Sequence, residues 1–224
     1  MPSKKASFDP ALSKAVVQVG QGRGFIIEHR VKRPCWPRFL CQRIVLTAAH
    51  CLPYLPPCHA ASLCHERTYK LLGTLDSPKA AVWAECLFAD PIGDIAVLGE
   101  PDNQALVREA GAYEALTQEA PALKVVRTPE SGRAWLLALD GEWVCCRVEV
   151  NGQCLWISPT AKCEGGMSGS PILADDGAAM GIVVVGGEVS AAGGKAKPVE
   201  SGPHPVLPHH LPRWLLLANG ASRK

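Results

Sequence analysis

Residues 135–157 read WLLALDGEWVCCRVEVNGQCLWI. Two dipeptides in this stretch, Asp140-Gly141 and Asn151-Gly152, each lie between apolar runs. Tight two-residue hairpin turns require positive φ angles, which Gly adopts freely and Asn adopts more readily than most residues. The stretch therefore predicts three consecutive antiparallel strands, at residues 135–139, 144–150 and 154–157.

The same pattern continues on both sides of this meander. Short β-rich runs alternate with Gly, Pro, Asn and Asp, and only residues 101–119 and 213–219 look helical. We expect an all-β fold in which the first six strands form one barrel. The polar, Ala-rich and Glu-rich stretch 101–119 is typical of a linker with some helix. The further expected strands are residues 15–19, 24–28, 43–47, 69–75, 82–88, 95–98, 171–173 and 180–185.

Composition and the N-terminal sequence weigh against a nucleic-acid-binding protein and against a secreted or membrane-spanning one. The 224 residues include 23 Lys and Arg and 21 Asp and Glu, and the basic residues are scattered, which gives no case for nucleic acid binding. The start, Met1-Pro2-Ser3-Lys4-Lys5-Ala6, leads into no uninterrupted apolar segment, so we expect neither a secretory leader nor a membrane span. The expected location is cytoplasmic.

Ten cysteines are many for a protein with no export signal. Cys35 and Cys41 are separated by five residues, as are Cys58 and Cys64, so a four-thiolate zinc site is conceivable. Zinc ligands usually lie two to four residues apart within a pair, however. We therefore expect reduced, mostly buried thiols and no cofactor, with structural zinc at these four cysteines as the alternative.

Three short motifs carry candidate chemistry. His50 follows small residues at the end of a β-rich run, and Asp94 stands at the start of an apolar strand. Ser168 lies within Gly165-Gly166-Met167-Ser168-Gly169-Ser170-Pro171. The glycines there have no side chains, so the backbone can come close to another group. Taken singly, each has an ordinary structural explanation: a buried or surface histidine, a turn aspartate and a glycine-rich loop.

Jointly the motifs resemble the chymotrypsin-like, or trypsin-like, serine peptidase family. They occur in the order His, Asp, Ser, each at a strand end in an all-β pattern, and the likeness spans nearly the whole chain. The nucleophile motif is closest to that of bacterial members with Gly-x-Ser-Gly-Ser-Pro. The matching segments are residues 22–27, Thr47–Cys51, Asp94–Leu98, Gly166–Pro171, Gly181–Gly186 and the terminal helix around Trp214.

This resemblance implies two six-stranded antiparallel barrels, a short C-terminal helix and an active site between the barrels. Residues 1–110 would form the barrel that carries His50 and Asp94, and residues 111–224 the barrel that carries Ser168. His50 would be the general base, Asp94 its orienter and Ser168 the nucleophile, while the N–H groups of Gly166 and Ser168 would form the oxyanion hole. Activity would then need neutral His50 and rise with pH.

The sequence departs from the family pattern at several positions. Met167 stands where zymogen-activated members carry an aspartate, so activation by a freed N-terminus is not expected. Cys51 has no bridging cysteine, because the partner position falls near Gly22, and no cysteine follows Cys163. Lys162 matches a place in the floor of the primary pocket, which argues against a basic residue before the scissile bond; the alternative is that its side chain points into solvent. An acidic residue there would suit Lys162, but Val183 replaces the histidine of glutamate-specific members. The wall predicted to bind substrate backbone includes Val184, Val185 and Gly186.

These features favour a serine endopeptidase acting through an acyl-enzyme on specific intracellular proteins or peptides, either active as made or controlled by a regulatory partner. One alternative keeps the fold but is a latent or non-catalytic binding module that needs a partner. An enzyme alternative is an α/β-hydrolase using Ser168 with His204 and either Asp175 or Asp176. Ser170 breaks the Gly-x-Ser-x-Gly elbow of that fold, and the chain lacks its alternating strands and helices.

Overall fold

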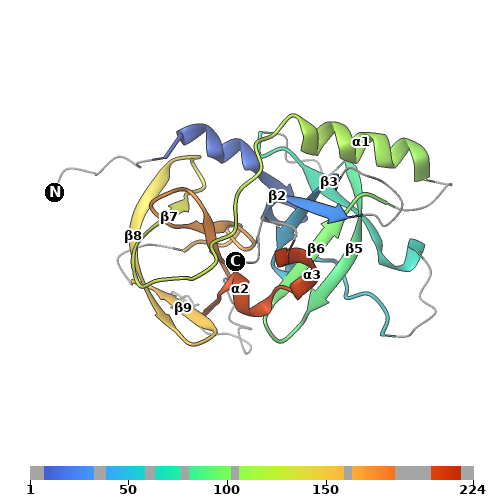
Figure 1. The fold of residues 1–224 in the computed structure, drawn as a ribbon. Helices are drawn as coiled ribbons and strands as arrows, with labels where there is room; N and C mark the ends of the chain where they lie inside the picture. Colours follow the sequence, from blue (N-terminus) through green and yellow to red (C-terminus); the bar gives the residue numbers. More distant parts are fainter. Residues whose placement is uncertain are drawn as a thin grey trace, which may run out of the picture.

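The computed structural model describes residues 8–32, 39–58, 64–76, 81–101, 106–158, 163–184 and 203–217. Two six-stranded antiparallel sheets lie side by side, one a closed barrel and the other nearly closed (Figure 1). A short helix, α3 (Arg213–Leu217), lies near the C-terminus. The expected all-β fold class with two barrels and a C-terminal helix is confirmed.

The first barrel contains β1 to β6 in the order β1-β2-β3-β6-β5-β4. It closes because β1 pairs with β4, with Gln18 opposite Gly73. One core cluster fills its interior with side chains such as Val19, Ile26 and Leu98, each of them fully buried. The strands are β1 (Val16–Val19), β2 (Gly22–Lys32), β3 (Phe39–Thr47), β4 (Thr68–Gly73), β5 (Val82–Asp90) and β6 (Ile95–Gly99).

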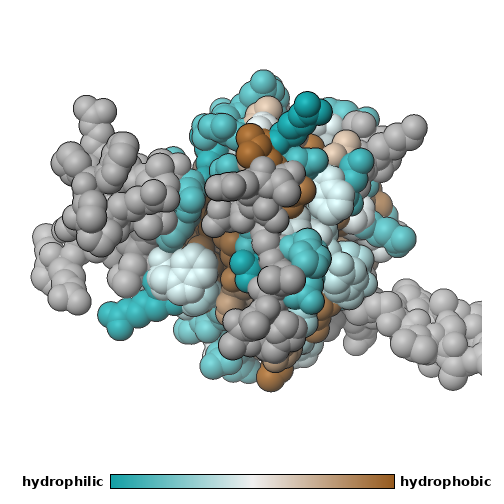
Figure 2. Space-filling view, turned by 90° about the vertical axis from the view of Figure 1, so that its right-hand side faces the viewer, coloured by the Kyte–Doolittle hydropathy of each residue, from teal (hydrophilic) through white to brown (hydrophobic). Residues whose placement is uncertain are grey.

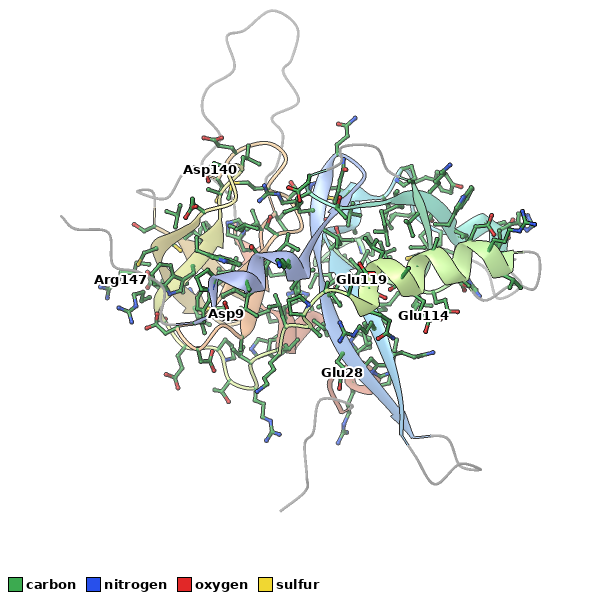
Figure 3. All side chains as sticks on the ribbon, turned by 90° about the horizontal axis from the view of Figure 1, so that it is seen from above. Asp9, Glu28, Glu114, Glu119, Asp140 and Arg147 are labelled. Atoms are coloured by element: carbon green, nitrogen blue, oxygen red, sulfur yellow. The ribbon has the colours of Figure 1, made fainter. Side chains whose placement is uncertain are left out.

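The predicted helical linker is α1 (Val107–Gln118). It packs on β5 and β3 of the first barrel, where the buried Tyr113 hydroxyl donates to the Leu98 or Arg43 carbonyl. The helix therefore runs across the boundary predicted between residues 110 and 111 and lies with the first barrel. Figure 3 shows it from above with Glu114 and Glu119, and shows β2 and β3 projecting beyond the barrel as a two-stranded ribbon.

The second sheet has the order β11-β10-β7-β8-β9-β12. A bridge between Gly181 and Val206 brings its two edges together, so the sheet nearly closes around its own apolar core. Gly141 (φ 87°) and Gly152 (φ 60°) have the expected positive φ, but Asp140 and Asn151 do not. Asn151 is still paired with Cys154 at the end of β8, so Gly152 and Gln153 form the second turn. The strands are β7 (Gly132–Leu137), β8 (Trp143–Asn151), β9 (Cys154–Ile157), β10 (Pro171–Leu173), β11 (Ala179–Ile182) and β12 (His204–Pro205).

The two ends of the described chain each pack on the opposite half of the molecule. Phe8, just before the 3₁₀ helix η1 (Pro10–Ala15), makes edge contacts with Trp135 and Trp143 of the second sheet. At the other end, Trp214 of α3 packs edge-on against His29 of β2. These exchanged contacts hold the two halves together, and their neighbouring apolar side chains merge into one core cluster.

Short elements complete the fold. The 3₁₀ helices η2 (Ala49–Cys51) and η3 (Cys64–Arg67) follow β3 and precede β4, and α2 (Leu207–His210) follows β12. Figure 2 shows one face of the molecule, on which hydrophilic side chains are interspersed with hydrophobic ones. Among the described residues, no helix has the length and apolar character needed to cross a membrane.

Candidate active site

His50 lies at the end of β3, in η2. Ala48 and Ala49 are buried and carry only methyl side chains, so the backbone can turn sharply there and leave the imidazole at the surface of the first barrel. The His50 side chain is 43% exposed. The ring is therefore reachable from solvent while its backbone is anchored to a closed barrel.

Asp94 is held against His50 by both carboxylate oxygens. Its Oδ1 accepts the backbone N–H of His50 at 2.9 Å, and its Oδ2 lies 2.6 Å from the ring Nδ1. The Asp94 carbonyl also accepts the N–H of Ala49 at 3.1 Å. Asp94 is the one described non-glycine residue with a positive φ, 53°, which points its carboxylate back at the η2 segment.

This contact changes the electrostatics of the ring. The hydrogen bond from the ring to Asp94, with a smaller contribution from the Cys51 side chain, holds the pKa of His50 well above its ordinary value of 6.5, although partial burial opposes the change. Because Asp94 can only accept, the Nδ1 atom of His50 must carry its proton. In neutral His50 the Nε2 atom is therefore the free base.

Ser168 lies in a turn in which backbone angles favour glycine at positions 166 and 169 and packing requires it at 169. Gly166 (φ 93°) and Gly169 (φ 83°) have backbone angles that other residues rarely adopt. Any Cβ at Gly169 would collide with the Arg23 carbonyl, so the turn sits directly on β2 of the first barrel. The Ser168 carbonyl accepts the Arg23 N–H at 2.7 Å, and the Gly169 N–H donates to Val183.

His50, Gly166 and Ser168 line one cleft between the two halves. Its volume is about 510 Å³, and its other walls come from Gly20–Gly22, Cys51–Pro53 and Lys70–Leu71. Ser168 is 7% exposed. Within the described chain, its Oγ has no hydrogen bond to His50 or to another residue. Such contacts are often long in substrate-free proteins and tighten when substrate binds.

The N–H groups predicted to hold an oxyanion have no acceptor among the described residues. In the part of the chain that the structure covers, no acceptor receives the N–H of Gly166 or of Ser168, whereas the neighbouring N–H groups of Met167, Gly169 and Ser170 are all taken by carbonyls. A positive φ at Gly166 is what turns its peptide out of that hydrogen-bonded pattern. The two donors are thus available to an incoming oxygen atom.

Arg23, which lies outside the residues that line this cleft, supports the candidate site and was missed by sequence reasoning. It is only 6% exposed, and its guanidinium donates to the Leu137 and Ala138 carbonyls at the end of β7. Its backbone N–H meanwhile binds Ser168. Arg23 therefore connects the turn around Ser168 and the β7–β8 hairpin to the first barrel. The only signal in the sequence was its place between Gly22 and Gly24, two glycines that leave room for close packing.

The structure shows what Cys51 and Met167 contact, two residues at which the sequence departs from the family pattern. Cys51 lies beside Gly22, where an added Cβ would come 2.5 Å from its Sγ, and the thiol donates weakly to the Ser168 carbonyl at 3.7 Å. Met167 is 2% exposed and packs into the second core. Its apolar side chain therefore anchors the turn around Ser168 in the core of the second sheet.

The predicted substrate wall is described only in part. Val184 lies beside the nucleophile turn, because its neighbour Val183 pairs with Gly169 and Ser170. The N–H of Val184 donates to His204 Nδ1 at 2.9 Å. Lys162, Val185 and Gly186 lie outside the described residues.

His204 and the two aspartates of the hydrolase alternative lie in other arrangements. Burial lowers the pKa of the fully buried His204 to about 4, and its Nδ1 accepts the N–H of Val184. Asp175 pairs with Arg133 and Trp135, while Asp176 accepts the N–H of Ala178. None of these contacts joins His204 to a carboxylate, so this triad is not assembled.

The zinc alternative gains no support from the residues that can be seen. Among the described residues, no group of three or more His, Cys, Asp and Glu could hold a metal ion. Cys35 lies outside them, as do the side chains of Cys41 and Cys64, while Cys58 is exposed. Elsewhere burial raises the pKa of Cys86 to about 11 and of Cys146 to about 12, so these thiols stay protonated.

Comparison with known proteins gives matches among solved structures alone. No family model matches the chain, and no curated protein matches it. The structure is similar to the Rv3671c protease of M. tuberculosis in its inactive form (16% identity, 98% of this chain and 97% of that one, TM-score 0.44). It is also similar to a human pathogenic astrovirus serine protease (13%, 90% and 92%, 0.46) and to the NS6 protease of murine norovirus 1 (14%, 88% and 90%, 0.46).

Proposed function

We propose that the protein is a serine endopeptidase in which Ser168 is the nucleophile, His50 the general base and Asp94 its orienter. One observation carries the proposal: a single carboxylate binds both the ring and the backbone N–H of His50, at the edge of a cleft that Ser168 also lines. A turn aspartate with an ordinary structural role has no need to fix the tautomer of a half-exposed imidazole.

The proposed reaction follows from these atoms. His50 Nε2 takes the proton from Ser168 Oγ, which attacks the carbonyl carbon of the scissile peptide bond. The Gly166 and Ser168 N–H groups bind the oxygen that becomes negative. His50 then protonates the departing amine, leaving an ester on Ser168. Water, deprotonated by His50, hydrolyses this acyl-enzyme and restores the free serine.

A second groove favours cleavage within a chain over removal of a terminal residue. It has a volume of about 750 Å³ and shares Gln21, Gly22 and Gly166 with the cleft of Ser168. Glu119 at the end of α1 and Asp140 of the β7–β8 hairpin line it from the two halves (Figure 3). A polypeptide bound across Ser168 has space to continue along this groove.

The decisive experiment is intact-mass spectrometry after incubation with a fluorophosphonate probe, which forms an adduct with an activated serine. The native chain should gain one adduct, and Ser168→Ala and His50→Ala should both lose it. His209→Ala, which changes an exposed histidine on α2, is the matched control and should label as the native chain does. Labelling that survives Ser168→Ala would exclude this site.

A latent binding module is the second candidate, and one observation favours it: Ser168 Oγ has no hydrogen bond to His50 within the described chain. If the folded native chain does not label at any pH, this candidate replaces the peptidase. The regulatory partner, the intracellular protein or peptide substrate, the cytoplasmic location and the absence of a cofactor stay predictions. The residue preferred before the scissile bond also stays open, because Lys162 is outside the described chain.

A further inference from the structure

A second imidazole, His210, lies against the turn that presents Asp94. Its Nδ1 is 3.3 Å from Asp90 Oδ2, and its Nε2 is 3.3 Å from the Gln153 carbonyl. Asp90 ends β5 of the first barrel, whereas Gln153 belongs to the β8–β9 hairpin of the second sheet. His210, at the end of α2, therefore connects the two halves at the 90–94 turn.

The Asp90 carboxylate organises this turn from within. Its Oδ1 accepts the N–H groups of Ile92 and Gly93 at 2.9 and 3.0 Å, and its Oδ2 faces His210. Burial alone would raise the pKa of Asp90, but the Gly93 N–H and the His210 ring outweigh it and hold that pKa below its ordinary value. The carboxyl group is thus an anion that both the turn and the ring stabilise.

The His210 ring also packs directly on the backbone next to Asp94. A Cβ at Gly93 would collide with His210 Nδ1 and would lie 2.6 Å from Asp90 Oδ2. Gly93 is buried, and the residue that follows it is Asp94 in its left-handed conformation. Movement of the ring would therefore release the peptide that sets the direction of the Asp94 carboxylate.

We propose that His210 is a positioning residue: it clamps the 90–94 turn to the second sheet and so keeps Asp94 aligned with His50. The clamp rests on the proposed function, because alignment of Asp94 matters for a reaction that uses His50 as base. His210 itself has no place among the residues that line the Ser168 cleft. It acts through the sequence of contacts from Gln153 to Asp90 and on to Asp94.

The two ring nitrogens can be tested separately. Both face oxygen atoms, so each bond requires an N–H on that side of the ring. A neutral imidazole has one N–H and makes one of the two bonds, whereas the protonated ring makes both. An asparagine amide reaches roughly the position of Nδ1 and retains donation to Asp90, whereas a glutamine amide reaches roughly the position of Nε2 and retains donation to Gln153. His210→Leu removes both donors. His209→Asn, on the same helix but exposed, is the matched control.

The experiment combines NMR titration of the His50 imidazole with the rate of fluorophosphonate labelling, measured across the pH profile of each variant so that rates are compared both with His210 protonated and with His210 neutral. His210→Leu should move the His50 pKa towards its ordinary value and slow labelling about tenfold, because misplacement of a catalytic group by a fraction of an ångström carries a cost of this order. His210→Asn should retain most of both properties. His210→Gln should behave as His210→Leu does, and His209→Asn as the native chain.

The outcomes separate the clamp from the proposed function. If His210→Leu is folded but its His50 titration and labelling match the native chain, the clamp is wrong. It is also wrong if the glutamine variant retains what the asparagine variant loses, and this comparison holds even where the leucine variant fails to fold. If the native chain does not label, the proposed function fails while the His50 titration still reports on the clamp.

Discussion

Two turns meet at the cleft, and they are held in place by different means. In the 90–94 turn, hydrogen bonds fix Asp94: its two carboxylate oxygens and its carbonyl all have partners on η2. In the turn around Ser168, close packing of glycine fixes the backbone, and two N–H groups have no acceptor among the described residues.

The difference matches what each turn must do in the proposed reaction. An orienting carboxylate is useful only when it is fixed before substrate arrives, so its polar atoms are satisfied within the protein. Oxyanion donors are useful only when they are free, so their turn must be rigid without using them. Glycine packed against β2 provides that rigidity, because Gly169 has no side chain to displace.

Removing the charge of Asp94 should have the largest effect on the rate of labelling, because it disrupts the contact between the 90–94 turn and His50. Asp94→Asn keeps the shape of the side chain but can offer its N–H₂ group to His50 Nδ1, which favours the wrong tautomer. We expect the rate of fluorophosphonate labelling to fall about 10³- to 10⁴-fold, by analogy with the loss that this change causes in serine peptidase triads. The rates should be compared on the alkaline plateau of each protein. A loss below tenfold would contradict the role of Asp94.

Adding one methyl group should break the packed turn. Gly169→Ala introduces a Cβ into contact with the Arg23 carbonyl and 2.7 Å from Thr47 Oγ1, at a φ of 83°. We expect the free energy of unfolding to fall by about 3 kcal/mol, and labelling of Ser168 to fall with it. Chemical denaturation measures the first effect, and intact mass measures the second.

The control for this substitution is Gly152→Ala. Gly152 also has a positive φ, 60°, but nothing lies within 4 Å of its added Cβ. It should lose only about 1 kcal/mol of stability, from backbone strain. Equal losses in the two variants would show that strain alone, and not contact with β2, fixes the nucleophile turn.

The sequence predicted most of the strands because their signals are local. The Asp140-Gly141 and Asn151-Gly152 turns, and the alternation around them, depend on residues within a few positions of one another. β12 was missed, since His204–Pro205 is a two-residue strand inside a Gly-rich and Pro-rich stretch. Its place in the sheet is set by pairing with Leu155 and Cys154, about fifty residues earlier.

Candidate residues of the site could be named from the sequence, but their supports could not. His50, Asp94 and Ser168 stand in short motifs, each with its own local pattern. Arg23 and His210 act through contacts with residues more than a hundred positions away, at Leu137 and Asp90. Such contacts depend on how the two halves dock, and no local periodicity encodes docking.

The smallest expected effect is on the pH dependence of labelling, which distinguishes the 90–94 turn from the turn around Ser168. Labelling needs neutral His50, so the rate should rise with pH and reach half its maximum at the His50 pKa. Because Asp94 raises that pKa, the midpoint of the native chain should lie well above 6.5. In Asp94→Asn the midpoint should fall towards 6.5, since the carboxylate that favours the charged ring is gone.

In Gly169→Ala, where the His50–Asp94 contact is untouched, the midpoint should stay high even though the rate is lower. A fall of the midpoint in both variants would mean that the two turns are not independent, and that the packed turn also sets the electrostatics of His50.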